Sequence, residues 1–264
     1  MDVLRRNNVK VFGKGQQAMI FCHGFGCDQN MWRYITPAFQ HLYKIVLFDQ
    51  IGAGASDSTA YDESKYSSLQ GYATDLLEIC NSLQLEHAVF VGHSVGAMIG
   101  ILSAIREPEH FEKMILIGPS PCYLNEAAYT GGFERSDIQA MLEFMDKDFM
   151  DWSNTFAPFI MGNPDKPSLG EELARSFCSS DSYIARRFAR VTFLSDNRSD
   201  LPKLTTDSLI LQCAEDMIAP AEVGAYVHQA LQHSTLVHLK ATGHCPNLSA
   251  PIETIAAMET YLTQ

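Results

Sequence analysis

The chain has 264 residues, of which 46% are hydrophobic and 19% are charged, and its formal net charge at pH 7 is −12. This length and composition predict a globular fold with a large core and argue against disorder. The acidic balance, with no Lys/Arg cluster, excludes nucleic acid and anionic membranes as expected partners.

The cysteine content and the first residues of the chain indicate the cellular compartment in which we expect the protein. The seven cysteines are an odd number and include no Cys-x-x-Cys pair. The first residues lack the apolar stretch of a signal peptide, and no apolar run approaches the roughly 18–20 residues that span a bilayer. We therefore expect a cytoplasmic protein with reduced cysteines, no disulfide framework and no metal site.

Short apolar runs alternate with helical patterns along most of the chain. Runs that are apolar at nearly every position are typical of parallel strands covered by helices on both faces. We predict strands at residues 9–12, 18–22, 44–48, 88–91, 114–117, 209–213 and 235–239. We predict helices between them at residues 31–41, 69–83, 97–105, 223–231 and 252–262. This alternation predicts an α/β fold with a mostly parallel sheet and helices on both faces.

Residues 123–194 break the alternation. They show no convincing strand, and helical patterns at residues 137–147, 149–161, 169–178 and 183–194. We predict that this insertion forms a helical cap over the carboxyl edge of the sheet, where open α/β sheets bind ligands. Residues 1–122 and 195–264 then form the core, and residues 1–264 a single domain.

The motif with the most specific chemistry is Gly92-His93-Ser94-Val95-Gly96. It follows the predicted strand at residues 88–91 and precedes the predicted helix at residues 97–105. This context indicates a nucleophile elbow, in which glycines relieve crowding around a strained serine. The helix start places the Val95 N–H group beside Ser94, ready to stabilise an oxyanion. The competing interpretation is a glycine-rich turn with an incidental serine.

A serine nucleophile needs a base that is held by an acid. In hydrolases with this elbow the chain order is Ser, then Asp or Glu, then His. His244 follows the last predicted strand, so we predict it as the base. Asp216 and Glu215 both follow the preceding strand and are candidates for the acid. We favour Asp216, because the residues after it match a common D-x-x-x-P spacing.

A second oxyanion donor is expected in the loop after the strand at residues 18–22. His23-Gly24-Phe25-Gly26 is an HG-x-G segment in that loop, and it predicts the Phe25 N–H group as the donor. The alternative is an ordinary turn at a strand end. The glycine-rich segments at residues 13–15 and 52–56 lack the rest of a phosphate loop or a dinucleotide fingerprint, so we predict no cofactor.

Beyond these motifs, segments spread over nearly the whole chain carry a family resemblance, at residues 24–29, 89–96, 118–125, 131–134 and 243–246. They resemble the RsbQ-type bacterial α/β-hydrolases, which activate a stress-signalling phosphatase, and the related plant karrikin and strigolactone receptors. Residues 156–159 and 195–198 also resemble the plant proteins. Cys122 stands where the plant receptors typically carry a basic residue, which favours the bacterial branch.

The resemblance implies the α/β-hydrolase fold with a V-shaped four-helix cap over a small apolar pocket. It implies Ser94, Asp216 and His244 as a catalytic triad and the N–H groups of Phe25 and Val95 as oxyanion donors. It also places aromatic and aliphatic residues as candidates for the pocket lining: Phe25, Tyr123, Phe133, Trp152, Phe156, Phe193 and Ile218.

The expected function is that of a serine hydrolase acting on a small hydrophobic ester or lactone and regulating a signalling phosphatase or another protein. Two alternatives remain. One is a metabolic carboxylesterase with no protein partner, and the other is a ligand-binding switch whose hydrolysis is incidental.

Overall fold

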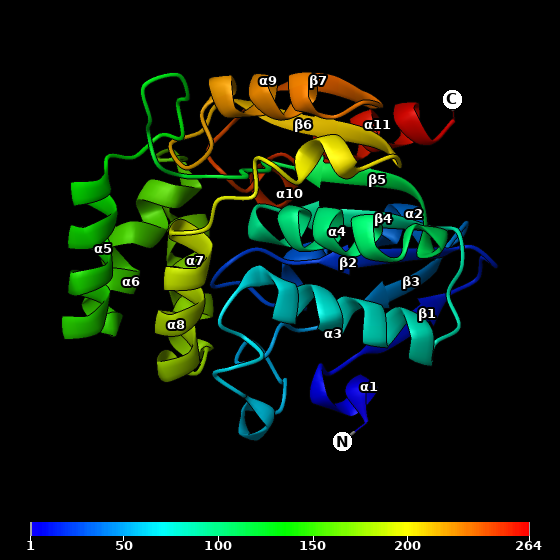
Figure 1. The fold of residues 1–264 in the computed structure, drawn as a ribbon, viewed down its shortest axis with the longest axis horizontal. Coiled ribbons are helices and arrows are strands. Elements are labelled where there is room, and N and C mark those ends of the chain that lie inside the picture. The colour runs from blue at the N-terminus through cyan, green and yellow to red at the C-terminus, as the bar shows by residue number, and fades with distance from the viewer. Residues whose placement is uncertain (1, 264) are drawn as a thin grey trace.

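The computed structural model describes residues 2–263 and is built on one seven-stranded sheet, in the order β1-β3-β2-β4-β5-β6-β7 (Figure 1). β1 runs antiparallel to β3, and all other neighbouring pairs are parallel. The strands are β1 (Lys10–Gly13), β2 (Ala18–Cys22), β3 (Lys44–Leu47), β4 (Ala88–His93), β5 (Phe111–Ile117), β6 (Asp207–Glu215) and β7 (Ser234–Thr242). The predicted mostly parallel sheet is therefore confirmed.

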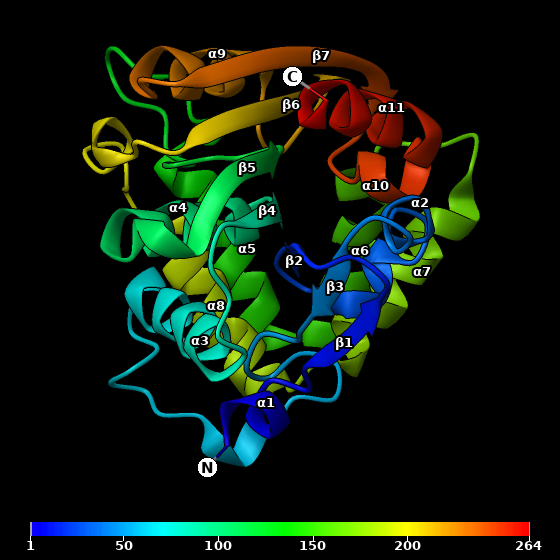
Figure 2. The same ribbon diagram turned by 90° about the vertical axis from the view of Figure 1, so that its right-hand side faces the viewer.

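Helices cover both faces of this sheet. One face packs against α3 (Leu69–Ser82), α4 (Val95–Arg106) and α9 (Ala221–Ala230), and the other against α2 (Thr36–Phe39) and α11 (Pro251–Leu262) (Figure 2). Successive side chains of a strand point to opposite faces, so every residue of a central strand enters one of the two cores. All residues of β2 and β4 are buried accordingly, which explains their continuous apolar sequence.

The segment after β2 differs from the prediction. In place of one helix at residues 31–41, a 3-10 turn, η1 (Gln29–Trp32), is followed by the separate short helix α2. Pro37 lies in the first turn of α2. Because proline has no N–H group to donate, it can begin a helix but cannot continue one. The remaining short elements are α1 (Val3–Arg6), η2 (Ser58–Ala60), η3 (Pro108–His110), η4 (Leu201–Lys203) and α10 (Pro246–Ser249).

Four helices form a cap between β5 and β6, at the left of Figure 1. They are α5 (Arg135–Lys147), α6 (Phe149–Met161), α7 (Pro167–Ser179) and α8 (Ser182–Phe193). The chain enters and leaves the cap at one place, because Cys122 and Asp196 form an isolated antiparallel bridge and Asn197 N–H donates to Pro121 C=O over 2.8 Å. Within residues 2–263, no helix is long and apolar enough to cross a membrane.

Candidate active site

The turn between β4 and α4 places Ser94 at the carboxyl edge of the sheet. Ser94 has φ 55° and ψ −126°, a backbone conformation that residues other than glycine rarely adopt. Glycines at two neighbouring positions make the turn possible. A Cβ atom at Gly92 would lie 2.7 Å from Ala97 Cα, and one at Gly96 would lie 2.5 Å from Cys22 C=O. The elbow is thus fixed by the close packing of α4 against β2 and β4.

Ser94, His244 and Asp216 are joined by hydrogen bonds, although they come from three separate strand ends. His244 Nε2 lies 2.8 Å from Ser94 Oγ, and His244 Nδ1 lies 2.7 Å from Asp216 Oδ2. All three side chains are buried. Because the carboxylate only accepts, Nδ1 carries the hydrogen, and Nε2 is free to accept the Ser94 hydroxyl hydrogen.

The surroundings of Asp216 keep it ionised. Burial opposes the charge, but attraction to His244 and hydrogen bonds from His244 and from the N–H groups of Ile218 and Ala219 outweigh it. The pKa of Asp216 therefore lies below its ordinary value. The competing acid, Glu215, is exposed and has no contact of its side chain with His244 among the described residues.

Two backbone N–H groups near Ser94 are available as donors. Neither Phe25 N–H nor Val95 N–H has an acceptor within residues 2–263. Val95 is the first residue of α4, where the helix dipole is positive. Phe25 lies in the turn after β2, which Cys27 N–H closes on Gly24 C=O over 3.3 Å. Within residues 2–263 both N–H groups therefore lack an acceptor, as a donor to an oxyanion requires.

His93 contacts the backbone of His244. Its Nε2 lies 2.8 Å from the backbone oxygen of His244, and since a carbonyl oxygen only accepts, Nε2 carries the hydrogen. Burial is the main reason why the pKa of His93 is lowered to about 3, and repulsion from His244 adds to it. His93 is therefore neutral, and it holds the backbone of the residue that contacts Ser94.

A small cavity of about 30 Å³ lies over Ser94, with room for about one water molecule. Of the predicted lining residues, Phe25, Tyr123, Phe193 and Ile218 line it. Burial raises the pKa of Tyr123 to about 12, against a hydrogen bond with Ser94 that lowers it, so its hydroxyl stays neutral.

The other three predicted lining residues, Phe133, Trp152 and Phe156, do not line the cavity but lie behind its wall. Phe133 packs against Phe193 at a ring-centroid distance of 6.5 Å, and Trp152 stacks on Phe156 at 5.4 Å. Trp152 itself packs on two lining residues, Phe177 of α7 at 5.2 Å and Phe25 at 6.2 Å, which lie between its ring and the cavity.

Several lining residues were not predicted: Cys27, His93, Ile160, Leu173, Phe177, Thr192 and Cys245. Cys27 and Cys245 lie next to predicted motifs, and that adjacency was a usable signal. The sequence carries no such signal for the four lining residues of the cap, because their positions depend on how the cap helices pack. These four are Ile160, Leu173, Phe177 and Thr192. Within residues 2–263, no group of three or more His, Cys, Asp or Glu side chains is arranged to hold a metal ion.

The lowered pKa of His93 predicts a pH dependence of stability. The pKa of this group moves from 6.5 to about 3 on folding, so below pH 6.5 the unfolded chain binds a proton that the folded chain does not. Above pH 6.5 this group does not change the free energy of unfolding with pH. As the pH drops from 6.5 toward 3, it lowers the free energy of unfolding by about 1.4 kcal/mol per pH unit. In His93→Gln, the amide side chain retains a hydrogen-bond donor but no longer binds a proton in this pH range. Urea unfolding from about pH 7 to pH 4.5 should therefore show a shallower decline for the variant.

His233→Gln, at an exposed histidine, is the control and should keep the wild-type slope. His23, which is also buried with a lowered pKa, remains in both proteins and does not affect the difference. Equal slopes for wild type and His93→Gln would show that another group carries the effect.

Comparison with known proteins agrees with this fold. The Alpha/beta hydrolase family profile matches residues 19–258. Strigolactone esterase D14 of Arabidopsis thaliana is 39% identical over 253 residues, covering 96% of this chain and 94% of that protein. Karrikin insensitive 2 receptor CA of Petunia hybrida is 37% identical over 246 residues, covering 93% and 91%.

Among solved structures, a hydrolase from Oleispira antarctica superimposes with a TM-score of 0.97 at 37% identity, covering 100% of this chain and 97% of that one. The esterase from Exiguobacterium antarcticum has the same fold, with a TM-score of 0.89 at 22% identity. The chain therefore belongs to the alpha/beta hydrolase family, as an enzyme with esterases among its relatives.

Proposed function

We propose that this chain is a serine hydrolase that cleaves a small hydrophobic ester or lactone, with Ser94, Asp216 and His244 as its catalytic triad. The observation that carries the proposal is the continuous hydrogen-bonded chain from Asp216 through His244 to Ser94, which ends at a mostly apolar cavity between the core and the cap. The esterases among its relatives support an ester bond as the target.

In the first half of the reaction, Ser94 Oγ attacks the carbonyl carbon while His244 Nε2 takes the hydroxyl proton. The ionised Asp216 stabilises the resulting imidazolium. The carbonyl oxygen becomes an oxyanion, and the N–H groups of Phe25 and Val95 donate to it. When the bond to the leaving oxygen breaks, His244 returns the proton to that oxygen. Ser94 then carries the acyl group.

In the second half, a water molecule gives a proton to His244 Nε2 and attacks the acyl carbon through the same oxyanion site. Collapse of this intermediate breaks the bond to Ser94 Oγ, which regains its proton from His244. The products are a carboxylic acid and an alcohol, or a single opened chain if the substrate is a lactone. No cofactor is needed at any step.

The cavity supports a compact and mostly apolar substrate. Its lining is largely aromatic and aliphatic. Because its volume of about 30 Å³ holds about one water molecule, the cap must move to admit any acyl group, and a short acyl group requires the smaller movement. Two buried polar atoms of lining residues have no partner within residues 2–263, His93 Nδ1 and the Thr192 hydroxyl, and the hydroxyl belongs to the cap. A second oxygen on the substrate, as in a lactone or an alkoxy ester, would satisfy this hydroxyl.

The triad predicts a steep loss of activity from two conservative variants. Ser94→Ala removes the nucleophile, and Asp216→Asn replaces the carboxylate with an amide that favours the wrong tautomer of His244. We expect each variant to lower kcat for p-nitrophenyl acetate by about 10⁴–10⁶-fold.

Two variants serve as matched controls. Ser103→Ala changes a buried serine of α4 that donates only to backbone oxygens, and Glu215→Gln changes the neighbouring exposed carboxylate. Both should stay close to the wild-type rate. A folded Ser94→Ala protein with full activity would contradict the proposed function, and a larger loss in Glu215→Gln than in Asp216→Asn would reassign the acid.

The cavity predicts a preference for short acyl groups. Each methylene that fits contributes about 0.8 kcal/mol, whereas overfilling a packed cavity costs about 1–3 kcal/mol. In a series of p-nitrophenyl esters, kcat/KM should peak at short acyl chains. Leu173→Ala, which enlarges the cavity from α7, should move the peak to longer chains. Rates that rise steadily to long chains in the wild type would instead indicate an open groove.

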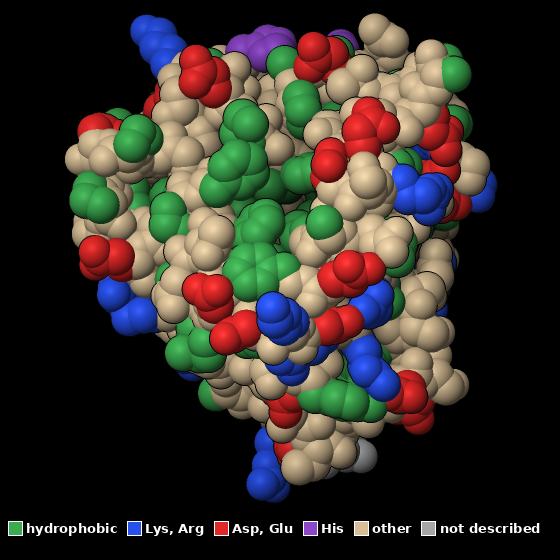
Figure 3. Space-filling view, turned by 90° about the vertical axis from the view of Figure 1, so that its left-hand side faces the viewer, with side chains coloured by type: hydrophobic (Ala, Val, Ile, Leu, Met, Phe, Trp, Pro, Cys, Tyr) green, Lys and Arg blue, Asp and Glu red, His purple; other side chains and the backbone are tan. Residues whose placement is uncertain are grey.

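We further propose that the enzyme acts in signalling, as the RsbQ-type resemblance implies, by engaging a phosphatase through the cap around residues 136–200. Receptors among its relatives support a signalling role. The face that carries the cap displays hydrophobic side chains gathered between acidic and basic ones (Figure 3). In this proposal residues 123–194 cover the active site of a single domain and also form the surface that contacts the phosphatase. Seven free cysteines support a cytoplasmic setting.

The signalling proposal predicts a specific partner in the native cell. Affinity capture with the wild-type protein should recover a protein phosphatase, and Ser94→Ala should recover less, because a switch requires different affinity for two states of the site. Recovery of no phosphatase by either form would favour the carboxylesterase without a partner. Equal recovery by both would favour a binding switch in which hydrolysis is incidental.

A further inference from the structure

The turn that holds one of the two oxyanion donors is short and depends on its surroundings. Its closing hydrogen bond, from Cys27 N–H to Gly24 C=O, is long at 3.3 Å. Gly26 has φ +70°, which a type II turn requires at its third position. From the core side, His23 Nδ1 donates to Gly24 C=O over 2.9 Å. Gly24 C=O and the Phe25 N–H group belong to one planar peptide, so this contact holds the donor from the core side. The hydrogen bond from Cys27 N–H holds the same peptide from the other side, and Cys27 N–H in turn shares its peptide with Gly26 C=O at the tip of the turn.

The tip is held by the cap helix α7. Ser176 Oγ donates to Gly26 C=O over 2.8 Å. The next residue, Phe177, packs directly on Gly26, where an added Cβ atom would come within 1.6 Å of its ring. Two consecutive residues of α7 therefore fix Gly26, one through its backbone oxygen and the other through the space above its Cα.

The side chain of Phe25 joins the same turn to the rest of the cap. Its ring lies 6.2 Å from that of Trp152 on α6, 5.8 Å from that of Phe177 on α7, and 6.0 Å from that of Phe193 on α8. Aromatic pairs at these distances attract one another beyond their buried area. Three cap helices thus contact the residue whose N–H group is the proposed donor.

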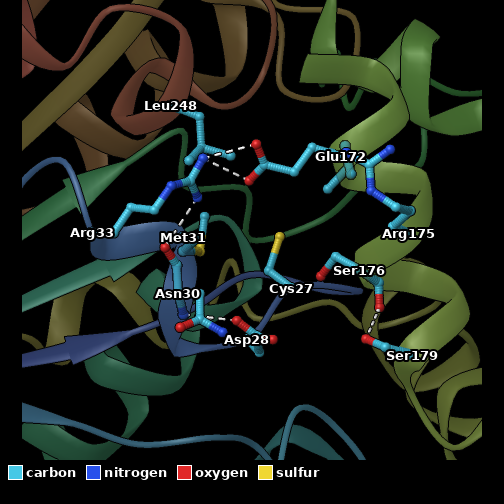
Figure 4. Close-up of a pocket in the computed structure, with 11 residues that line it drawn as sticks. Cys27, Asp28, Asn30, Met31, Arg33, Glu172, Arg175, Ser176, Ser179 and Leu248 are labelled. Atoms are coloured by element: carbon cyan, nitrogen blue, oxygen red, sulfur yellow. Dashed lines mark hydrogen bonds and ion pairs between the residues drawn. The ribbon is translucent and has the colours of Figure 1, made fainter. Parts of the chain in front are cut away.

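An ion pair extends the attachment along α7. Glu172, one helical turn before Ser176, pairs with Arg33 at 2.7 Å, and Arg33 also donates to Asn30 C=O (Figure 4). The pair is partly exposed, so its own contribution to stability is small. Its position is informative, because it is a further contact between α7 and the chain that continues from the turn.

From these contacts we infer that α7 positions the oxyanion hole, with Ser176 as a positioning residue that aims the Phe25 N–H group when the cap is closed. The inference rests on the proposed function. The inference also links substrate binding to the geometry of the oxyanion hole, because Phe177 both lines the cavity and packs on Gly26. An acyl group that displaces Phe177 also releases the tip of the turn.

The test compares Ser176→Ala with Ser179→Ala. Ser179 lies one turn later on α7 and, like Ser176, lines a surface pocket between α7 and the chain after the turn, but its hydroxyl donates only to Ser176 C=O (Figure 4). Losing a whole oxyanion donor lowers kcat by about 10²–10³-fold. Because Ser176→Ala leaves the donor in place but less well aimed, we expect kcat per active site to fall by about tenfold, with KM unchanged. Ser179→Ala should match the wild type, and Ser176→Thr should restore activity.

A second readout separates positioning from folding. A boronic acid adds to Ser94 Oγ as a tetrahedral anion that places an oxygen in the hole, so its Ki for Ser176→Ala should rise by the same factor by which kcat/KM falls. Unchanged kcat and Ki in this variant would overturn the inference, and so would a fall in kcat without a rise in Ki. If Ser94→Ala itself remained active, the proposed function would be the part that failed.

Discussion

The packing of α4 against the sheet is the constraint on which the rest of the site depends. The helix approaches β2 and β4 so closely that side chains are excluded at Gly92 and Gly96. This approach forces Ser94 into a backbone conformation that costs energy, of the order of 1–3 kcal/mol. The buried core on that side of the sheet supplies the compensating stability, and the strain holds Oγ in one place. His244 and Asp216 can then be positioned by ordinary strand ends.

Charge in the site is arranged around one ionised group. Asp216 is kept negative by His244 and two backbone N–H groups, while His93 and His23 are kept neutral by burial. Each neutral ring has one nitrogen that donates to a backbone oxygen, His93 to that of His244 and His23 to that of Gly24. These two side chains fix the backbone on either side of Ser94 without adding charge to a region of low dielectric.

Much of the sheet and the position of the triad could be predicted from the sequence, because both depend on local signals. Continuous apolar runs mark strands buried on two faces, and Ser94, Asp216 and His244 each follow such a run. The apolar spacing of residues 31–41 favours one helix, whereas Pro37 within it can begin a helix but not continue one, which accounts for the break. The cavity lining could not be predicted in the same way. Whether Phe177 or Trp152 faces Ser94 depends on the packing of α7 against α6 and the core, and that packing is a tertiary property.

The bridge between Cys122 and Asp196 has a consequence for how the protein folds and diversifies. Since both ends of the cap meet at one point, the core closes a single loop over residues 122–196 when it folds, and the entropy cost of closing such a loop grows only slowly with its length. The sheet can therefore form as a cooperative unit before α5 to α8 are ordered. Substitutions at cap residues that line the cavity, such as Leu173, alter its shape without changing the strands that carry Ser94 and Asp216.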